Sequence, residues 1–509
     1  MRRTIAAVTL SLAVAVSGVL ALTAPVQTAG AAAADPGKPS SAPATSARRH
    51  LSVAERVLDG RAATADPSAS MALRELWQSL PALSESERRR AEALLARPTD
   101  GAADPFGFGY SVPAVKKCAR HVCLHWVTST EDAPPSKRWV KQNLRQMERV
   151  WHLETGKLGY REPLKDGRLG GNKKFDVYLK DVGSVGLYGY CAAEKRVQRF
   201  LASGYCVLDD DFSRAQFPAS PKKSLQVTAA HEFFHAVQYA YDAEDDRWML
   251  EATATWMEER VADGANDNRQ YLPFGQVQNP AEPLDTGGGG ALNQYGNWTF
   301  FEFLSKKFGT RVVRDIWSKM AADKKSPDFY STQALVKVLA RKGGLTKVFS
   351  EYAAGNTVPH KTYPEGGRYP SATISGAARL SRSTRRAAYT GTLQHLTSAN
   401  YTYKPAANLR KRSWKLKVKI DGPQRKTSPS AYVLVDQRRG PDVKRLVKLS
   451  GKGRATVKVP FSSRRVKRVT VTMVNASTRF RCFRQTSFSC EGVPKDDGLS
   501  FSIKAVARK

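Results

Sequence analysis

Two histidines four positions apart, with a glutamate directly after the first, occur in the stretch VTAAHEFFHAVQYAYD at residues 227–242. On a helix, positions i and i+4 share one face, so His231 and His235 can present two imidazole nitrogens to one metal ion. Glu232 then lies beside that face, where its carboxylate can take a proton from a water molecule. The pattern therefore predicts a zinc site capable of hydrolysis.

A catalytic zinc ion also needs a third protein ligand, and its type separates the families of such sites. The metzincin extension requires Gly at position 238 and His at position 241, but Gln238 and Tyr241 stand there, which excludes that family. Downstream, RWMLEATATWMEERV predicts a second helix, and Glu251 lies on it, sixteen residues after His235.

This second stretch resembles the gluzincin zinc peptidases, because WMLEA partly matches the W-L-N-E-G stretch of their aminopeptidase branch. The chain is more closely similar to a group of secreted bacterial proteins regarded as metalloproteases. That resemblance covers about residues 115–310 and rests on AAHEFFHAVQ, WMLEATATWME, FDVYLKDV and GLYGY. It implies zinc binding and peptidase activity, and it implies no particular substrate.

The resemblance also implies a role for each site residue. His231, His235 and Glu251 would bind Zn²⁺, and Glu232 would be the general base and later the proton donor. Glu258, seven residues after Glu251 on the same helix face, is the alternative third ligand, or it orients a zinc-bound histidine.

Gluzincins use a Tyr or His to stabilise the oxyanion. Tyr295, at the start of a predicted helix after GGGG, is the candidate here. The alternative is a tyrosine of the core or of the cleft rim.

Several elements must position these residues. HVCLHWVT, FDVYLKDV and YCVLDDDF predict strands, and PPSKRWVKQNLRQMERVWHLE predicts a helix. On a strand, His121 and His125 stand roughly 13 Å apart at Cα and cannot share an ion. The acids at 209–211 are expected to be solvated near a turn. The apolar side chains of the HEFFH helix are expected to pack into the core, namely Phe233, Phe234, Val237 and Tyr241.

The sequence predicts an α+β zincin-like metallopeptidase domain with a helical C-terminal subdomain, followed by a small all-β, sandwich-like domain. Ser84 and Glu87 form an expected capping box in the N-terminal helical segment. The expected segments are a signal peptide at 1–34, a flexible Pro/Ala/Ser spacer at 35–50, a helical propeptide at 51–104, a catalytic subdomain at 105–265, a helical subdomain at 266–375 and a basic β domain at 385–509. The alternative for residues 51–104 is an ordinary N-terminal extension.

The six cysteines fall into local pairs, which in an exported chain favours disulfides over thiolate zinc sites. The expected pairs are Cys118 with Cys123, Cys191 with Cys206, and Cys482 with Cys490. We expect a secreted protein, extracellular or associated with the cell wall, with no transmembrane anchor once the signal is removed.

The net charge of +35 is unevenly distributed along the chain. Residues 401–509 hold 28 Lys and Arg against 6 Asp and Glu, a net charge of +22. We expect this segment to bind an anionic cell-wall polymer or polysaccharide, without specific nucleic-acid recognition.

Together these features predict a secreted, monomeric zinc metallopeptidase that acts on a protein or peptide substrate. The alternative is a non-catalytic, zinc-stabilised extracellular protein that binds through the basic domain.

Overall fold

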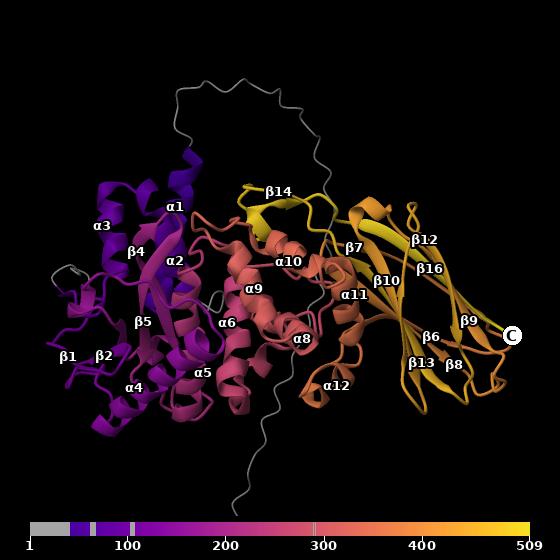
Figure 1. Cartoon of the computed structure of the whole chain (residues 1–509), viewed down its shortest axis with the longest axis horizontal. Helices are drawn as coiled ribbons and strands as arrows, with labels where there is room; N and C mark the ends of the chain where they lie inside the picture. Colours follow the sequence, from indigo (N-terminus) through magenta and orange to yellow (C-terminus); the bar gives the residue numbers. More distant parts are fainter. Residues whose placement is uncertain (1–40, 62–67, 102–106, 289, 291) are drawn as a thin grey trace, which may run out of the picture. The chain divides into compact units, whose positions relative to one another are not determined.

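The computed structural model describes residues 41–61, 68–101, 107–288, 290 and 292–509. The expected signal peptide at 1–34 lies outside these residues. All elements that matter for the site belong to one unit, Pro43–Lys509 (Figure 1).

The N-terminal segment is helical. Its helices are α1 (Ser41–Leu58), α2 (Ala69–Ser79) and α3 (Glu85–Leu94). The expected capping box is confirmed, because the Ser84 hydroxyl accepts from the backbone N–H of Glu87 while the Glu87 carboxylate accepts from the backbone N–H of Ser84.

The expected spacer is wrong over residues 41–50, which form the first part of α1. Proline is tolerated in the first helical turn, so Pro43 does not prevent the helix. Ala47 is buried and begins an apolar face that Leu51 and Ala54 continue at helical spacing.

Five strands form one mixed sheet in the order β1-β2-β3-β5-β4. They are β1 (Val115–Cys118), β2 (Val122–Trp126), β3 (Phe175–Lys180), β4 (Gly189–Gln198) and β5 (Leu201–Asp209). β2, β3 and β5 run parallel, whereas β1 and β4 pair antiparallel at the two edges. The central strands are almost fully buried, which explains their near-continuous apolar sequence.

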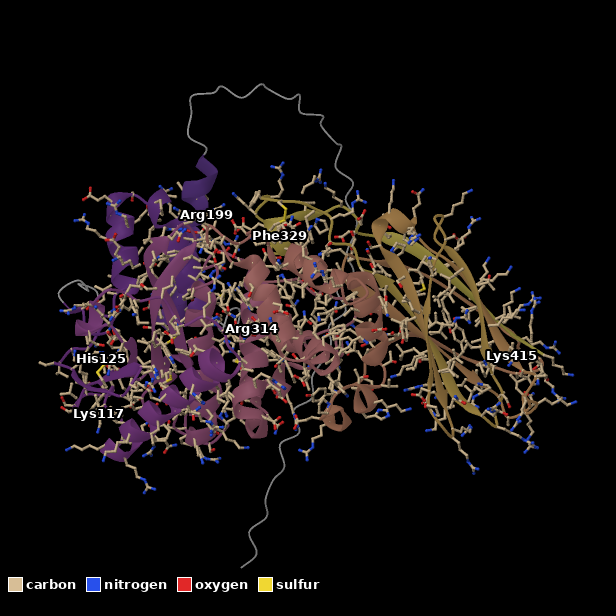
Figure 2. The ribbon with its side chains drawn as sticks, viewed as in Figure 1. Lys117, His125, Arg199, Arg314, Phe329 and Lys415 are labelled. Carbon is tan, nitrogen blue, oxygen red and sulfur yellow. A yellow bond between two sulfur atoms is a disulfide. The ribbon has the colours of Figure 1, made fainter. Side chains whose placement is uncertain are left out.

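The three strands expected from the sequence coincide with β2, β3 and β5. His125 on β2, which is labelled in Figure 2, bonds Asp176 at 2.8 Å, while His121 bonds Glu148 at 2.8 Å. The expectation of solvated acids at 209–211 is wrong for the first two, because Asp209 and Asp210 are buried. The Asp209 carboxylate accepts backbone N–H groups, and this turn chemistry outweighs solvation.

Helices α4 (Lys137–Trp151) and α5 (Pro221–Tyr239) pack against this sheet, and α6 (Arg247–Ala262) packs on α5. α5 is apolar on most sides because it is enclosed by β4, β5, α4 and α6. Phe233 packs against Trp151 and Phe175, and Phe234 packs against Tyr160 and Trp317. The expected packing of the HEFFH helix into the core is confirmed.

Further helices follow between the sheet and the C-terminal strands, and α6 packs against two of them, α7 and α8. They are α7 (Asn293–Gly296), α8 (Trp298–Phe308), α9 (Arg311–Met320), α10 (Ser331–Ala340), α11 (Leu345–Gly355) and α12 (Pro359–Thr362). Trp298 and Trp317 are fully buried among them.

Two further sheets enclose a second apolar core in the C-terminal part. Their orders are β11-β10-β13-β8-β6 and β12-β9-β16-β7. The strands are β6 (Ile374–Leu380), β7 (Arg386–Leu393), β8 (Thr397–Pro405), β9 (Lys415–Asp421), β10 (Pro429–Gln437), β11 (Val443–Val447), β12 (Arg454–Pro460), β13 (Val466–Asn475) and β16 (Leu499–Arg508). β6 begins before the expected boundary at 385, and its sequence ISGAARL has few β-branched residues to signal a strand.

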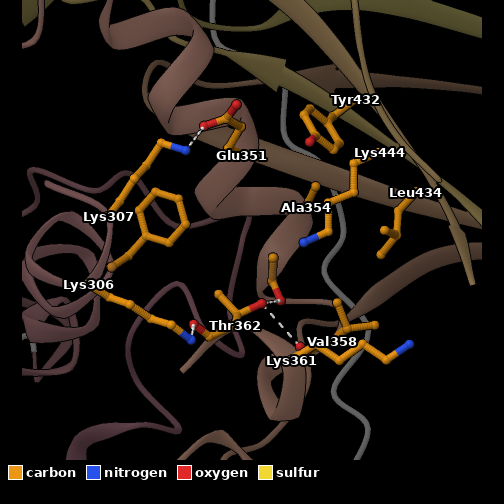
Figure 3. Close-up of a pocket in the computed structure, with 12 residues that line it drawn as sticks. Lys306, Lys307, Glu351, Ala354, Val358, Lys361, Thr362, Tyr432, Leu434 and Lys444 are labelled. Carbon is orange, nitrogen blue, oxygen red and sulfur yellow. Dashed lines mark hydrogen bonds and ion pairs between the residues drawn. The ribbon is translucent and has the colours of Figure 1, made fainter. Parts of the chain in front are cut away.

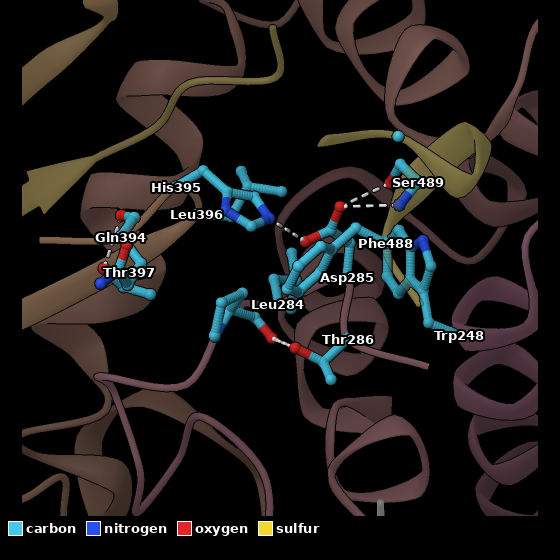
Figure 4. Close-up of polar contacts among 12 residues, drawn as sticks. Trp248, Leu284, Asp285, Thr286, Gln394, His395, Leu396, Thr397, Phe488 and Ser489 are labelled. Carbon is cyan, nitrogen blue, oxygen red and sulfur yellow. Dashed lines mark hydrogen bonds and ion pairs between the residues drawn. The ribbon is translucent and has the colours of Figure 1, made fainter. Parts of the chain in front are cut away.

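A short hairpin, β14 (Phe480–Arg481) with β15 (Val493–Pro494), lies next to a polar seam between the two parts. Asp285 accepts from Ser489 at 2.7 Å and bonds His395 at 2.9 Å (Figure 4). The backbone N–H of Cys490 donates to Asp246, the N-cap residue of α6, at 2.6 Å. The segment between β14 and β15 is therefore linked to the N-cap of α6 by a part-buried hydrogen bond.

The three expected disulfides are present, at Cys118–Cys123, Cys191–Cys206 and Cys482–Cys490. Disulfides persist in oxidising compartments, such as the extracellular space or the periplasm. Across the described residues, we find no helix with both the length and the apolar character needed to cross a bilayer.

Candidate metal centre

Helices α5 and α6 pack side by side and bring the three expected ligands together. One ligand atom from each of His231, His235 and Glu251 lies within 4.8 Å of the others. The Glu251 Oε2 atom is 3.2 Å from His231 Nε2 and 3.9 Å from His235 Nε2. A tetrahedral zinc ion with ligands at about 2.1 Å would separate its ligand atoms by roughly 3.4 Å. The spacing therefore suits an ion of this size.

His235 gives the most specific test of whether a cation fits. Its Nδ1 bonds the side-chain oxygen of Gln238 at 2.7 Å, and the Gln238 amide nitrogen donates to Leu250 O and Thr253 Oγ1. Because an amide oxygen only accepts, Nδ1 carries the proton and Nε2 carries a lone pair. That Nε2 is buried without a hydrogen-bond partner and faces a carboxylate. A cation between the two would satisfy both groups.

Glu258 contacts the other nitrogen of His231. Its carboxylate is 2.8 Å from Nδ1, so Nδ1–H donates to Glu258 and Nε2 is directed toward Glu251. A carboxylate on the outer nitrogen is the arrangement that orients a metal-binding histidine. The structure thus groups Glu251 with the two histidines and places Glu258 behind His231.

The pKa values of the site carboxyls are pushed apart by their surroundings. Burial raises the pKa of Glu251, but the hydrogen bond with His231, the charge of that histidine and the bond from Ser68 outweigh it and bring the pKa to about 2. Burial raises the pKa of Glu232 to about 6, against the opposing charge of His231. One carboxylate therefore stays ionised as a ligand should, while the other titrates near neutral pH, as suits a proton acceptor.

Tyr295 stacks on the His231 ring at 6.0 Å between centroids and lines the same cavity. Tyr271, which stacks on Tyr295 at 4.9 Å, also lines this cavity, as does Tyr188. Neither Tyr271 nor Tyr188 was predicted as a site residue from the sequence. Tyr188 lies in GLYGY, a stretch already tied to the site, whereas nothing in the sequence around Tyr271 pointed there.

Two serines from the N-terminal segment also reach the centre, and the sequence analysis missed them. Ser68 Oγ donates to Glu251 Oε1 at 2.6 Å, and Ser70 Oγ donates to Glu232 Oε2 at 2.6 Å. Ser68 could be read as a helix N-cap from its sequence, and its hydroxyl does accept from Met71 N–H. Its contact with Glu251 spans 183 residues and has no local signal.

A larger cavity, of about 340 Å³, lies between the helices and β10 (Figure 3). Two of its lysines already have acidic partners, since Lys307 pairs with Glu351 at 2.8 Å and Lys361 pairs with Asp436 and Asp442. The cavity beside the metal cluster is smaller, about 130 Å³. Chemistry therefore points to the smaller cavity, where the base and the candidate ligands converge.

No family model and no curated protein matches this chain. Among solved structures, a mutant of a periplasmic lysozyme inhibitor of g-type lysozyme from Escherichia coli is 12% identical, covering 26% of this chain and all of that one, with a TM-score of 0.15. A family GH115 4-O-methyl-alpha-glucuronidase is 9% identical, covering 70% of this chain and 54% of that one, with a TM-score of 0.14.

Proposed function

We propose that this protein is a secreted zinc metallopeptidase with His231, His235 and Glu251 as zinc ligands. The observation that carries the proposal is the buried, unpartnered Nε2 of His235 beside the Glu251 carboxylate, with His231 completing the cluster. Zinc held there would polarise a peptide carbonyl and acidify a water molecule. The proposal that the protein is secreted rests on the signal-like sequence of residues 1–34 and on the resemblance to secreted bacterial metalloproteases.

The chain's own residues perform the remaining steps. Glu232 takes the proton of the attacking water at its carboxylate and later gives it to the leaving amine. Glu258 holds the Nδ1 proton of His231 and thereby fixes the orientation of that ring. Tyr295, on the cavity wall beside His231, would donate to the carbonyl oxygen as negative charge develops.

Glu232→Gln separates this function from a purely structural zinc site. The variant keeps all three proposed ligands, so zinc content should stay near one per chain while casein hydrolysis falls by about three orders of magnitude or more. Glu131→Gln, at an exposed glutamate far before Glu232 in the sequence, is the matched control. Wild-type protein that binds zinc but cleaves neither casein nor a peptide library would favour the non-catalytic alternative.

We also propose that the C-terminal sandwich binds an anionic polymer. On the outer face of the β12-β9-β16-β7 sheet, like charges stand directly opposite each other, as Lys417 with Lys458, Lys419 with Lys504 and Lys415 with Arg508. Lys415 marks this sheet in Figure 2. Like charges opposite each other destabilise a sheet, and a bound polyanion would relieve that repulsion.

Two observations support this face as the contact surface. Burial and the charges of Arg508, Lys419 and Lys458 lower the pKa of Lys417. Within these four described strands the one acid is Asp421, which is paired with Arg454.

Retention on heparin tests the polymer proposal. Binding should fall steeply with salt through counterion release, and Lys417→Glu with Lys419→Glu should lower the elution salt strongly. Lys324→Glu with Lys325→Glu makes the same charge change on an exposed loop and should elute near the wild type. Equal elution of the two double variants would assign retention to net charge alone.

A further inference from the structure

The N-terminal helix α2 begins inside the candidate metal centre. Ser68 and Ser70 are 6% and 2% exposed, and their hydroxyls donate to Glu251 and Glu232 respectively. One short segment therefore contacts both the proposed third ligand and the proposed general base. Ser68 and Ala69 also line the cavity of about 130 Å³ beside these groups. This cavity is smaller than typical ligand pockets, which measure about 300–1,000 Å³.

The same segment covers the edge of the sheet next to the centre. In the described sheet, β4 has a strand neighbour on one side only. The backbone N–H of Cys191 on β4 donates to Ser70 Oγ at 2.8 Å. An extended peptide that binds by strand addition needs such edge N–H groups. Ser70 thus occupies a donor that a peptide substrate would use.

Strong contacts away from the centre hold α2 in place. Arg74 is 4% exposed and donates to the backbone oxygens of Ala243 and Asp245. Trp77 donates to the backbone oxygen of Glu194 on β4 at 3.0 Å. Farther along the N-terminal segment, Arg97 is 2% exposed and pairs with three carboxylates, those of Asp166, Asp176 and Glu194.

The blocking contacts leave the metal position accessible to an ion. Ser68 bonds Oε1 of Glu251, while Oε2 faces the histidines. His235 Nε2 has no hydrogen-bond partner. The segment therefore contacts the base and the strand edge without taking the ligand atoms.

We propose that residues 68–79 are an autoinhibitory plug, which keeps the centre able to bind metal but closed to peptide until it moves away. This inference rests on the proposed peptidase function, since it names the regulation of the same site. Because a peptide binds only the open form, its apparent affinity is the intrinsic affinity multiplied by the fraction of molecules that are open.

The test measures ligand binding to full-length, zinc-loaded protein as well as hydrolysis. The probes are the peptide hydroxamate acetyl-Ala-Phe-NHOH, which needs the strand edge, and acetohydroxamate, which is small enough to need only the ion. Ser68→Ala with Ser70→Ala removes two hydrogen bonds to charged groups and should tighten binding of the peptide hydroxamate at least about tenfold. Casein hydrolysis should rise in parallel.

Two further variants keep the test interpretable. Ser86→Ala, at an exposed serine of α3 outside the plug, should change neither readout. Arg74→Ala loosens α2 without touching the metal cluster, and it should give the same gain if the double serine variant fails to fold.

The outcomes separate the two proposals. Tighter peptide hydroxamate binding in the serine and arginine variants without any hydrolysis would support the plug and overturn the peptidase. Strong hydrolysis by the wild type that these variants leave unchanged or lower, with peptide hydroxamate binding also unchanged, would overturn the plug and support the peptidase.

Discussion

Replacing Glu251 by alanine should weaken zinc binding more than any change behind the ligands. Structural zinc sites bind with about 10–16 kcal/mol, so one of four ligands accounts for about 3–4 kcal/mol. Each tenfold change corresponds to about 1.4 kcal/mol, so Glu251→Ala should lower zinc affinity about 10²–10³-fold. Glu258 contacts only His231 Nδ1 within the cluster, and removing such a partner costs about 10–100-fold.

The assay is a competition titration of zinc between each full-length variant and a chelator at fixed pH. Circular dichroism checks folding, and Glu131→Ala, at an exposed site, serves as the control. Activity should fall with zinc content in Glu251→Ala. A folded Glu251→Ala protein with wild-type zinc affinity, or a Glu258→Ala protein that loses more zinc, would refute the assignment of Glu251.

Three other predictions concern stability. Burial opposes the charge of His395, but bonds to Asp285 and Asp497 raise its pKa above the ordinary value. The stabilisation from this charge is therefore fully present below about pH 6.5 and is lost as the pH rises through the pKa of the folded state. The difference in melting temperature between wild type and His395→Gln should therefore be largest at pH 5.5 and shrink by pH 9, and a constant difference would contradict this. Arg97→Met leaves three carboxylates without their shared cation and should lower the free energy of urea unfolding by about 3–5 kcal/mol. This loss should be smaller at pH 5, where the carboxylates can become protonated in the variant. Each disulfide closes a loop of 15 residues or fewer, so replacing Cys482 and Cys490 by serine should cost about 3 kcal/mol or less, and a larger loss of unfolding free energy would indicate native contacts broken along with the bond.

The local part of the centre could be predicted because its signals lie within a few residues of each other. The i, i+4 spacing of the histidines sets their shared helix face, and the apolar positions between them set how α5 is buried. The capping box at Ser84 and the three short-range cysteine pairs are local in the same sense. In each case, the geometry of one turn or one hairpin settles the outcome.

The long-range part could not be predicted from one sequence. The bonds of Ser68 and Ser70 to the centre span 183 and 162 residues, and a serine before a helix gives only the N-cap signal. The strand β6 lies before the predicted domain boundary at 385, since pairing with β8 rather than its own composition stabilises it. Asp209 looked like a solvent-exposed acid because one of its backbone donors, Gly183, comes from elsewhere in the chain, while Phe212 is local.

The seam at the start of α6 has a consequence for the timing of biosynthesis. Asp246 is the N-cap residue of the helix that carries Glu251, and its carboxylate accepts from Ser331 and from the backbone of Cys490. A chain is made from its N-terminus, so these partners emerge from the ribosome long after the helix itself. The metal-binding helix can gain its last supporting contacts only when synthesis is nearly complete. A nascent chain halted before residue 480 should therefore hold zinc less tightly than the finished one, and equal zinc retention by the two would show that the seam plays no part in assembling the centre.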